Sequence, residues 1–73
     1  GENEGLAPHL RLSDREFETF RMISLGKSLT EIAGEMFLNV KTISTYRRRI
    51  LDKMNMKSTA ELINYALKNN LIN

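Results

Sequence analysis

The sequence predicts an all-α domain of four short helices, and three observations support this fold class. The spacing Ser-x-x-Glu, in which the serine caps the free helix amides and the glutamate bonds back, begins at Ser13, Ser28 and Ser58. Apolar residues recur at helical spacing after each of these serines. Hydrophobic residues make up 41% of the chain and charged residues 27%, which is the composition of a folded domain and not of a disordered tail.

Length and cysteine content restrict this fold to one small packed unit. A chain of seventy-three residues is near the smallest size that a hydrophobic core stabilises without disulfides or a bound metal ion. The sequence has no cysteine, so it has no disulfide or thiolate zinc site, and nothing indicates an oxidising compartment. No apolar run approaches the roughly 20 residues that span a bilayer, and no signal peptide begins the chain. We therefore expect a cytoplasmic protein with no membrane partner.

Residues 1–11 are predicted to be a linker or a remnant of an expression tag, and residues 12–73 the folded domain. The first segment contains two of the four glycines and the only proline, with no sustained apolar period. An opening glycine in place of methionine indicates a fragment of a longer protein. His9 is the only histidine, and with no cysteine or second histidine we expect a solvated side chain, neither metal ligand nor base.

The first helix is predicted over residues 14–24. Phe17, Phe20 and Ile23 fall at i, i+3 and i+6, as one buried face requires. Gly26 follows at the point where the chain must leave the helix. Glycine adopts the left-handed conformation of a helix end without steric penalty, so the helix is expected to stop there.

The second helix is predicted over residues 29–36, and a third follows it almost at once. Asn39 is a favourable N-cap for the third helix, which leaves a turn of three or four residues. This corner contains no glycine or proline, so side-chain packing must fix it. The residues expected to pack inside it are Ala33, Phe37, Leu38 and Ile43. Two helices that meet this closely form a helix-turn-helix.

The third helix, predicted over residues 40–53, lies in the most basic part of the chain. Residues 39–57 hold six of the eleven lysines and arginines but only one of the nine acids. A local basic field attracts a polyanion such as nucleic acid. A basic run is more often an ordinary solvated helix face, but the tight corner and the small hydroxyl residues beside the charges favour DNA.

A helical projection divides this third helix into three faces. The inward face consists of Ile43, Ile50, Leu51 and Met54, with Arg47 among them. The opposite face has no large apolar group and can meet base edges; it consists of Lys41, Ser44, Thr45, Arg48 and Asp52. The stripe between them offers hydroxyls and cations to the phosphate wall of a groove; it consists of Thr42, Tyr46, Arg49 and Lys53.

The fourth helix is predicted over residues 59–69. Its inward stripe is Leu62, Ile63, Ala66 and Leu67. The outer residues Asn64, Tyr65 and Lys68 offer a surface for a homodimer, although an ordinary solvated face is an equally good interpretation. The size of the chain favours a dimer, because one chain has one DNA-reading helix and two half-sites require two such helices.

With these helices assigned, the chain resembles the LuxR-type (GerE-type) DNA-binding domain, the output module of the NarL/FixJ class of bacterial response regulators. The segments that carry the resemblance are LSDREFETFRMISLGKS, LTEIAGEMFLNVKTISTYRRRILDKMNMKS and AELINYALKNNLI, which cover Leu12 to Ile72. The resemblance implies a four-helix domain whose third helix reads double-stranded DNA in the major groove, often as a dimer through the fourth helix. It implies no metal or cofactor, and it leaves room for a contact with RNA polymerase.

The resemblance also assigns individual residues. It places base contacts on Ser44, Thr45 and Arg48. It places phosphate contacts on Lys41, Thr42, Tyr46 and Arg49, with weaker claims for Lys53, Lys27, Ser28 and Thr30. The faces of the third helix, derived above without the family, indicate the same division.

Arg47 departs from the family pattern, because many relatives have an apolar residue at this place. The helical projection points it toward the core. We expect its stem to pack on the first or second helix while its guanidinium pairs with a carboxylate such as Glu16 or Glu31. On this interpretation Arg47 is a structural residue.

The function predicted from the sequence is sequence-specific DNA binding by a bacterial transcription regulator. One alternative is a helix-turn-helix module that binds an acidic protein partner. Another is a sigma-type promoter-recognition domain, against which the segment KMNMKS and the fourth helix count. We do not expect an enzyme, because no base stands near any serine in the sequence and no glycine-rich oxyanion loop is present.

Overall fold

The computed structural model describes residues 5–72. These residues form a short 3-10 helix, η1 (Pro8–Arg11), and the helices α1 (Asp14–Ser24), α2 (Leu29–Met36), α3 (Val40–Met54) and α4 (Thr59–Lys68). No strand occurs in the described part of the chain. The predicted all-α fold with four α-helices is confirmed; α3 ends one residue later and α4 one residue earlier than the sequence indicated.

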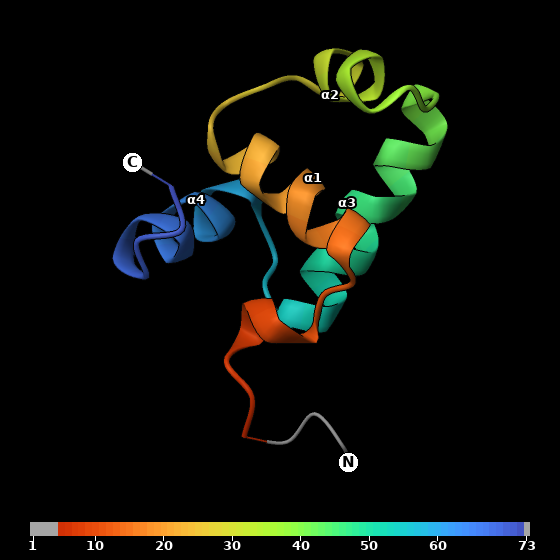
Figure 1. Ribbon diagram of the computed structural model, residues 1–73. Coiled ribbons are helices and arrows are strands. Elements are labelled where there is room, and N and C mark those ends of the chain that lie inside the picture. Colours follow the sequence, from red (N-terminus) through yellow and green to blue (C-terminus); the bar gives the residue numbers. More distant parts are fainter. Residues whose placement is uncertain (1–4, 73) are drawn as a thin grey trace.

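Helix α1 is the centre of the arrangement, and the other three α-helices pack around it (Figure 1). Helices α2 and α3 also contact each other, whereas α3 and α4 lie to the right and left of α1 in Figure 1. The core between them contains five fully buried large apolar side chains, Phe20, Ile32, Ile43, Ile50 and Leu62. Every α-helix contributes to this core, and α3 does so through Ile43, Ile50 and Met54.

The helix starts follow the capping chemistry expected from the sequence. Ser13 with Glu16 and Ser28 with Glu31 each form both bonds of a capping box. Ser58 accepts from the Glu61 amide, but the Glu61 carboxylate accepts from the Lys57 amide at 3.3 Å and not from Ser58. Local sequence therefore sets where each helix begins.

The four α-helices all end with a left-handed residue. Gly26, Phe37, Asn55 and Asn70 have φ angles of 90°, 57°, 56° and 56°. In each case the next amide donates to a carbonyl five residues back, over 2.9 to 3.2 Å, which is the Schellman arrangement. Gly and Asn tolerate this conformation, whereas a bulky side chain is strained in it. Phe37 is therefore the exception among the four.

The predicted packing of Phe37 inside the corner between α2 and α3 was wrong. The sequence placed it inside the corner, but its side chain is 93% exposed. The left-handed backbone directs the side chain outward, and Leu38 packs against the core after it. Ala33 and Ile43 are buried as expected.

The segment before α1 is also more ordered than the sequence indicated. Residues 8–11 form η1, which contacts α3. His9 is half-buried, its Nδ1 lies 2.7 Å from the hydroxyl of Tyr65, and its ring centroid lies 6.0 Å from that of Phe17. The expectation of a solvated His9 was wrong, because partners 56 residues away in α4 cannot be recognised from local sequence. Residues 1–4 of the expected linker lie outside the described residues.

Candidate nucleic-acid interface

The candidate interface is built on the corner between α2 and α3. Three residues, 37–39, separate the two helices. Asn39 fixes the start of α3, because its side-chain oxygen accepts from the Thr42 amide at 2.9 Å and from the Thr42 hydroxyl at 3.1 Å. Buried Ile43 and Ile50 then fix which face of α3 turns inward. The remaining face is left to solvent.

A shallow groove of about 300 Å³ runs along this exposed face of α3. It is lined by Lys41, Ser44, Thr45, Arg47, Arg48 and Leu51. The three residues predicted to read bases, Ser44, Thr45 and Arg48, thus lie in one groove together with Lys41. The Thr45 hydroxyl donates to the Lys41 carbonyl at 3.1 Å, so its lone pairs and its methyl group are what it offers to an external ligand.

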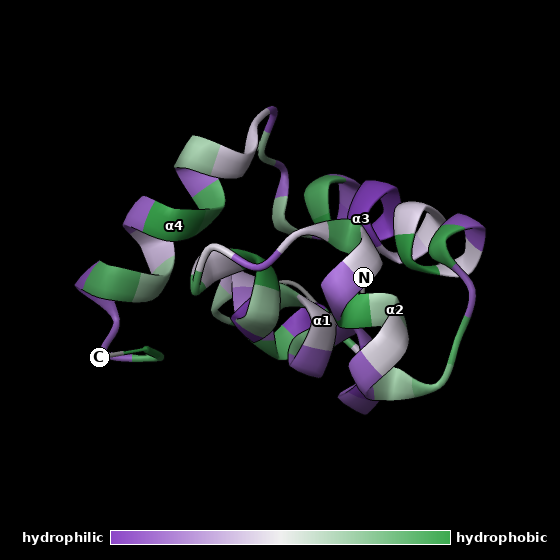
Figure 2. Cartoon of the chain, turned by 90° about the horizontal axis from the view of Figure 1, so that it is seen from above, coloured by the Kyte–Doolittle hydropathy of each residue, from purple (hydrophilic) through white to green (hydrophobic). Residues whose placement is uncertain are grey.

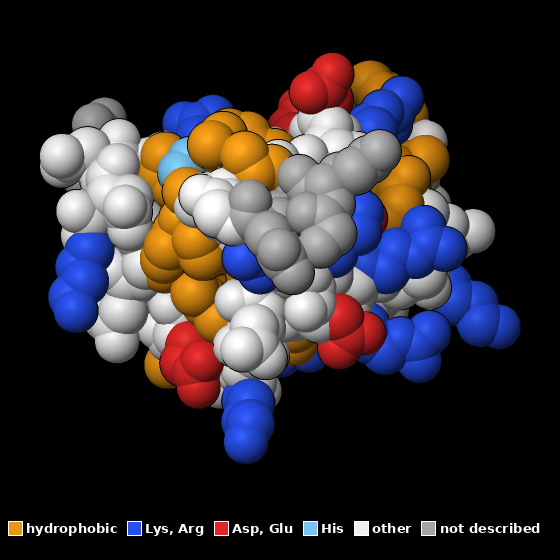
Figure 3. All heavy atoms as spheres, turned by 90° about the horizontal axis from the view of Figure 1, so that it is seen from below, with side chains coloured by type: hydrophobic (Ala, Val, Ile, Leu, Met, Phe, Trp, Pro, Cys, Tyr) orange, Lys and Arg blue, Asp and Glu red, His pale blue; other side chains and the backbone are white. Residues whose placement is uncertain are grey.

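The charge on this side of the molecule follows the same helix. Lys41, Arg48 and Arg49 are exposed, and Arg47 is half-buried. In Figure 3 the lysine and arginine side chains gather on the side where α3 lies in Figure 1, and Figure 2 shows the strongly hydrophilic stretch of this helix. Of the other predicted phosphate contacts on α3, Thr42 and Tyr46 are half-buried, and Tyr46 packs against the core.

Lys53 lies in a different environment from the other α3 cations. Its ammonium lies 2.7 Å from the carboxylate of Glu16, which is 3% exposed, at the start of α1. Burial alone raises the pKa of Glu16, but hydrogen bonds from Lys53 and the Ser13 amide outweigh it and hold that pKa below its ordinary value. Lys53 therefore links α3 to α1 through this ion pair.

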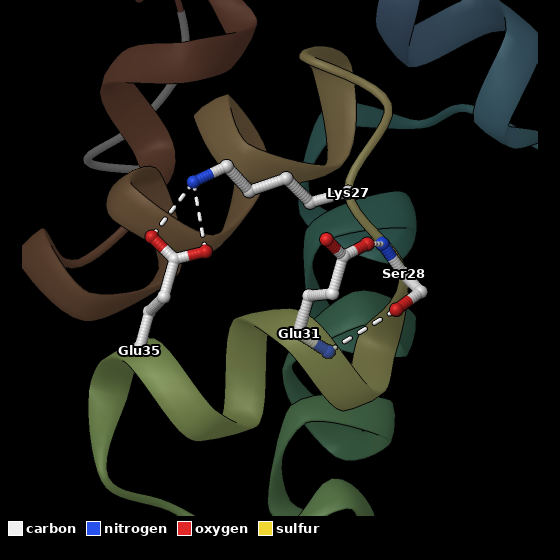
Figure 4. Close-up of polar contacts among 4 residues, drawn as sticks. All are labelled: Lys27, Ser28, Glu31 and Glu35. Atoms are coloured by element: carbon white, nitrogen blue, oxygen red, sulfur yellow. Dashed lines mark hydrogen bonds and ion pairs between the residues drawn. The ribbon is translucent and has the colours of Figure 1, made fainter.

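The predicted contacts before and within α2 are also largely engaged inside the chain (Figure 4). Both carboxylate oxygens of Glu35 accept from the Lys27 ammonium, at 2.7 and 2.8 Å. Ser28 forms a capping box with Glu31, and hydrogen bonds from the Ser28 amide hold the pKa of Glu31 below its ordinary value. Thr30 is exposed. The structure thus separates these residues from the groove of α3.

Arg47 has a different partner from the one expected. Its Nη2 donates to the hydroxyl of Thr59 at 3.0 Å, and no pairing with Glu16 or Glu31 forms. Those carboxylates are engaged elsewhere: Glu16 accepts from Lys53 and Ser13, and Glu31 accepts from the Ser28 amide. Arg47 therefore links α3 to the first residue of α4, a contact that spacing alone could not reveal.

Other chemistry finds little support in the described residues. No group of three or more histidine, cysteine, aspartate or glutamate side chains among them is placed to hold a metal ion. None of the described helices has the length and apolar character to cross a membrane. What the described surface does present is a basic, hydroxyl-bearing helix on a helix-turn-helix corner, which defines the class of protein as a helix-turn-helix DNA-binding domain.

Comparison with known proteins gives the family. The description "Bacterial regulatory proteins, luxR family" matches residues 10–66, so the chain belongs to the LuxR family, as the resemblance indicated. It is 47% identical over 60 residues to BvgA of Bordetella pertussis, which is named for positive transcription regulation of virulence factors; the match covers 82% of this chain and 29% of BvgA.

Further relatives include the oxygen regulatory protein NreC. The NreC of Staphylococcus carnosus is 42% identical over 65 residues, which cover 89% of this chain and 30% of that protein. The chain thus spans less than a third of the length of these relatives. No solved structure matches it. Membership in this family makes the chain a DNA-binding domain of a transcription regulator, of the kind found in response regulators.

Proposed function

We propose that α3 lies in the major groove of double-stranded DNA and reads sequence through Ser44, Thr45 and Arg48. The observation that supports this best is that the three side chains share one groove on the exposed face of a helix whose opposite face is fixed in the core. A rigidly held helix is what direct readout requires, because base-edge hydrogen bonds depend on position.

Arg48 is proposed as the main source of sequence choice. Its guanidinium can donate two hydrogen bonds to the O6 and N7 of guanine, the commonest specific contact in the major groove. Ser44 is less selective, since its hydroxyl both donates and accepts. The Thr45 hydroxyl, which donates to the Lys41 carbonyl, is left to accept. The Thr45 methyl group adds an apolar contact that suits thymine.

Lys41, Thr42, Tyr46 and Arg49 are proposed to contact phosphates. Such contacts fix the position of the helix and supply affinity that does not depend on sequence. Each phosphate that a cation neutralises releases condensed counterions, so affinity must fall as salt rises. Lys53, Lys27 and Ser28 are weaker candidates, because each would have to leave its partner within the chain. Thr30, which is exposed, has no such obstacle.

For the whole protein we propose a cytoplasmic bacterial response regulator in which this chain is the output domain. Residues 12–73 would form the DNA-binding domain, with η1 packed onto it. The proposed form on DNA is a homodimer that uses α4, where Asn64, Leu67 and Lys68 are exposed while Tyr65 is half-buried against His9. Contact with RNA polymerase would follow from regulation of transcription. We propose no cofactor and no enzymatic activity.

The proposal is tested by selecting DNA from a random duplex pool and then measuring binding of the selected site by fluorescence anisotropy at several salt concentrations. We expect tight binding to a site with two related half-sites, and affinity that falls steeply with salt. If no duplex binds at low ionic strength, the proposal is wrong, and binding of an acidic protein partner becomes the better explanation of the basic helix.

A further inference from the structure

Phe37 carries two energetic costs that the ends of the other helices avoid. Its backbone is left-handed, with φ of 57°, at the position where the other α-helices of the described chain have Gly26, Asn55 and Asn70. A bulky side chain is strained in this conformation. Asparagine or glycine at position 37 would close α2 in the same way without that strain.

The second cost is exposure to water. The Phe37 side chain is 93% exposed, whereas the next most exposed of the large hydrophobic residues, Leu10, is 58% exposed. An aromatic ring left in water forfeits the free energy that burial would give. Phe37 thus departs from two preferences, that for glycine or asparagine in the left-handed region and that for burial of aromatic rings. Such departures concentrate at functional sites. A ligand outside the chain that contacts the ring would account for both costs.

The surroundings of Phe37 indicate the ligand. Three residues later, Val40 begins α3 with its side chain 42% exposed, and the exposed cation Lys41 follows. We call Phe37 and Val40 the apolar edge. In the chain this edge immediately precedes Lys41, the first residue that lines the groove of α3. Two side chains are also too few for the area that a stable protein–protein contact buries. DNA is therefore favoured over a protein.

The chemistry of the major groove supplies one apolar group for such an edge. Among the base edges, only thymine presents a methyl group there, and apolar side chains, phenylalanine included, recognise it by contact. We propose that the apolar edge contacts thymine methyl groups and is a further specificity determinant, beyond Ser44, Thr45 and Arg48. This inference rests on the proposed function, that α3 enters the major groove.

The first test replaces the aromatic ring without disturbing the backbone. Phe37→Asn keeps a residue that tolerates the left-handed conformation, as Asn55 and Asn70 do. We expect a higher melting temperature, because strain is relieved, and a several-fold weaker affinity for the selected site. The dependence of affinity on salt should not change, because no charge is lost. Leu10→Asn, which removes an exposed apolar side chain from η1, should leave DNA affinity unchanged.

The second test identifies the methyl group. Each thymine of the selected site is replaced in turn by uracil, which differs only in lacking that methyl group. At one or more positions the wild-type domain should lose several-fold in affinity, and Phe37→Asn or Val40→Ala should make binding insensitive to the same replacement. Insensitivity of the wild type at every position would overturn the inference.

The outcomes separate this inference from the proposed function. Wild-type affinity of Phe37→Asn for the selected site would overturn the apolar edge while leaving DNA binding by α3 intact. If that variant also failed to support transcription from the bound site by purified RNA polymerase, Phe37 would belong to a protein contact instead. Failure of the wild-type domain to bind any duplex would overturn both proposals.

Discussion

Helix α3 carries similar side chains in two different settings. On its exposed face, Lys41 and Arg48 line one groove. In its last turn, Lys53 is paired with the buried carboxylate of Glu16, and its carbonyl accepts from Arg11 at 3.3 Å. The same basic run therefore offers ligand contacts along one face and joins helices near its C-terminal end. The sequence gives the number of cations in α3 but does not show which of them are free to bind a ligand.

The largest effect is expected from Arg48→Ala, on the exposed face. Loss of a two-bond contact to guanine should cost about 1 to 3 kcal/mol of discrimination between the selected site and a mutated one. Nonspecific affinity should fall much less. Anisotropy titrations with both duplexes measure the difference, and an equal loss on both would show that Arg48 contacts phosphate and not a base.

The next effect is expected from Glu16→Gln in α1, where the carboxylate pairs with Lys53 in the last turn of α3. The variant keeps an oxygen for the Ser13 amide but loses the ion pair with Lys53, which should cost about 1 kcal/mol, since Lys53 is partly exposed. The pKa of Glu16 is lowered in the folded state, so its contribution is present above the ordinary pKa of 4.5 and is lost as pH falls through the folded pKa.

Denaturant unfolding of Glu16→Gln and wild type between pH 7 and pH 3 tests this. The difference in free energy of unfolding should be largest near pH 7 and should shrink below pH 4.5. A difference that stayed constant over this range would mean that the carboxylate charge is not what stabilises the join. Sequence discrimination by the folded variant at pH 7 should match that of the wild type, because Glu16 does not line the groove of α3.

Arg47 lies between the two settings, because it lines the groove and also bonds to Thr59 of α4. Arg47→Ala removes the hydrogen bond to Thr59 and the packing of the arginine stem. The expected result is a loss of about 0.5 to 1.5 kcal/mol in stability, seen as a lower melting temperature, while sequence discrimination is kept. Thr59→Val is the matched control, since it deletes the other partner. An unchanged melting temperature with lost DNA binding would show that Arg47 faces the DNA.

The smallest effect distinguishes the exposed cation Arg49 from the paired cation Lys53 by salt dependence. Arg49→Ala should reduce the slope of log affinity against log salt by about 1, because one phosphate contact is lost. Lys53→Ala should change the slope less, because its charge is already paired with Glu16. The two slopes are measured on one nonspecific duplex. Equal changes for Arg49→Ala and Lys53→Ala would show that the ion pair with Glu16 does not withhold Lys53 from DNA.

How far the sequence predicts this molecule depends on the range of the interactions. The helix bounds were predicted within one residue because Ser13, Ser28 and Asn39 act on amides three residues away. The grouping of Ser44 with Arg48 follows from helical spacing alone. The partner of Lys53 in α1, by contrast, is 37 residues distant in sequence, and nothing local selects Glu16.

Phe37 shows a second kind of failure. Hydrophobicity placed it inside the corner, and its actual exposure follows from a left-handed backbone that its residue type disfavours. A signal was nevertheless present, because Gly26 and Asn55 occupy the same place after α1 and α3. A phenylalanine where helix-ending chemistry calls for glycine or asparagine is an inconsistency visible in the sequence, and such inconsistencies point to function.

The contact between His9 and Tyr65 also makes the domain convenient to observe optically. The chain has two tyrosines and no tryptophan, and the two phenols lie on different helices. Tyr46 belongs to α3, whereas the Tyr65 hydroxyl lies 2.7 Å from an imidazole nitrogen. Replacing Tyr65 with phenylalanine leaves Tyr46 as the only tyrosine, and the converse change leaves only Tyr65, whose hydroxyl contacts His9 of η1. A single pair of spectra can thus follow ligand encounter and release of the N-terminal turn as separate signals.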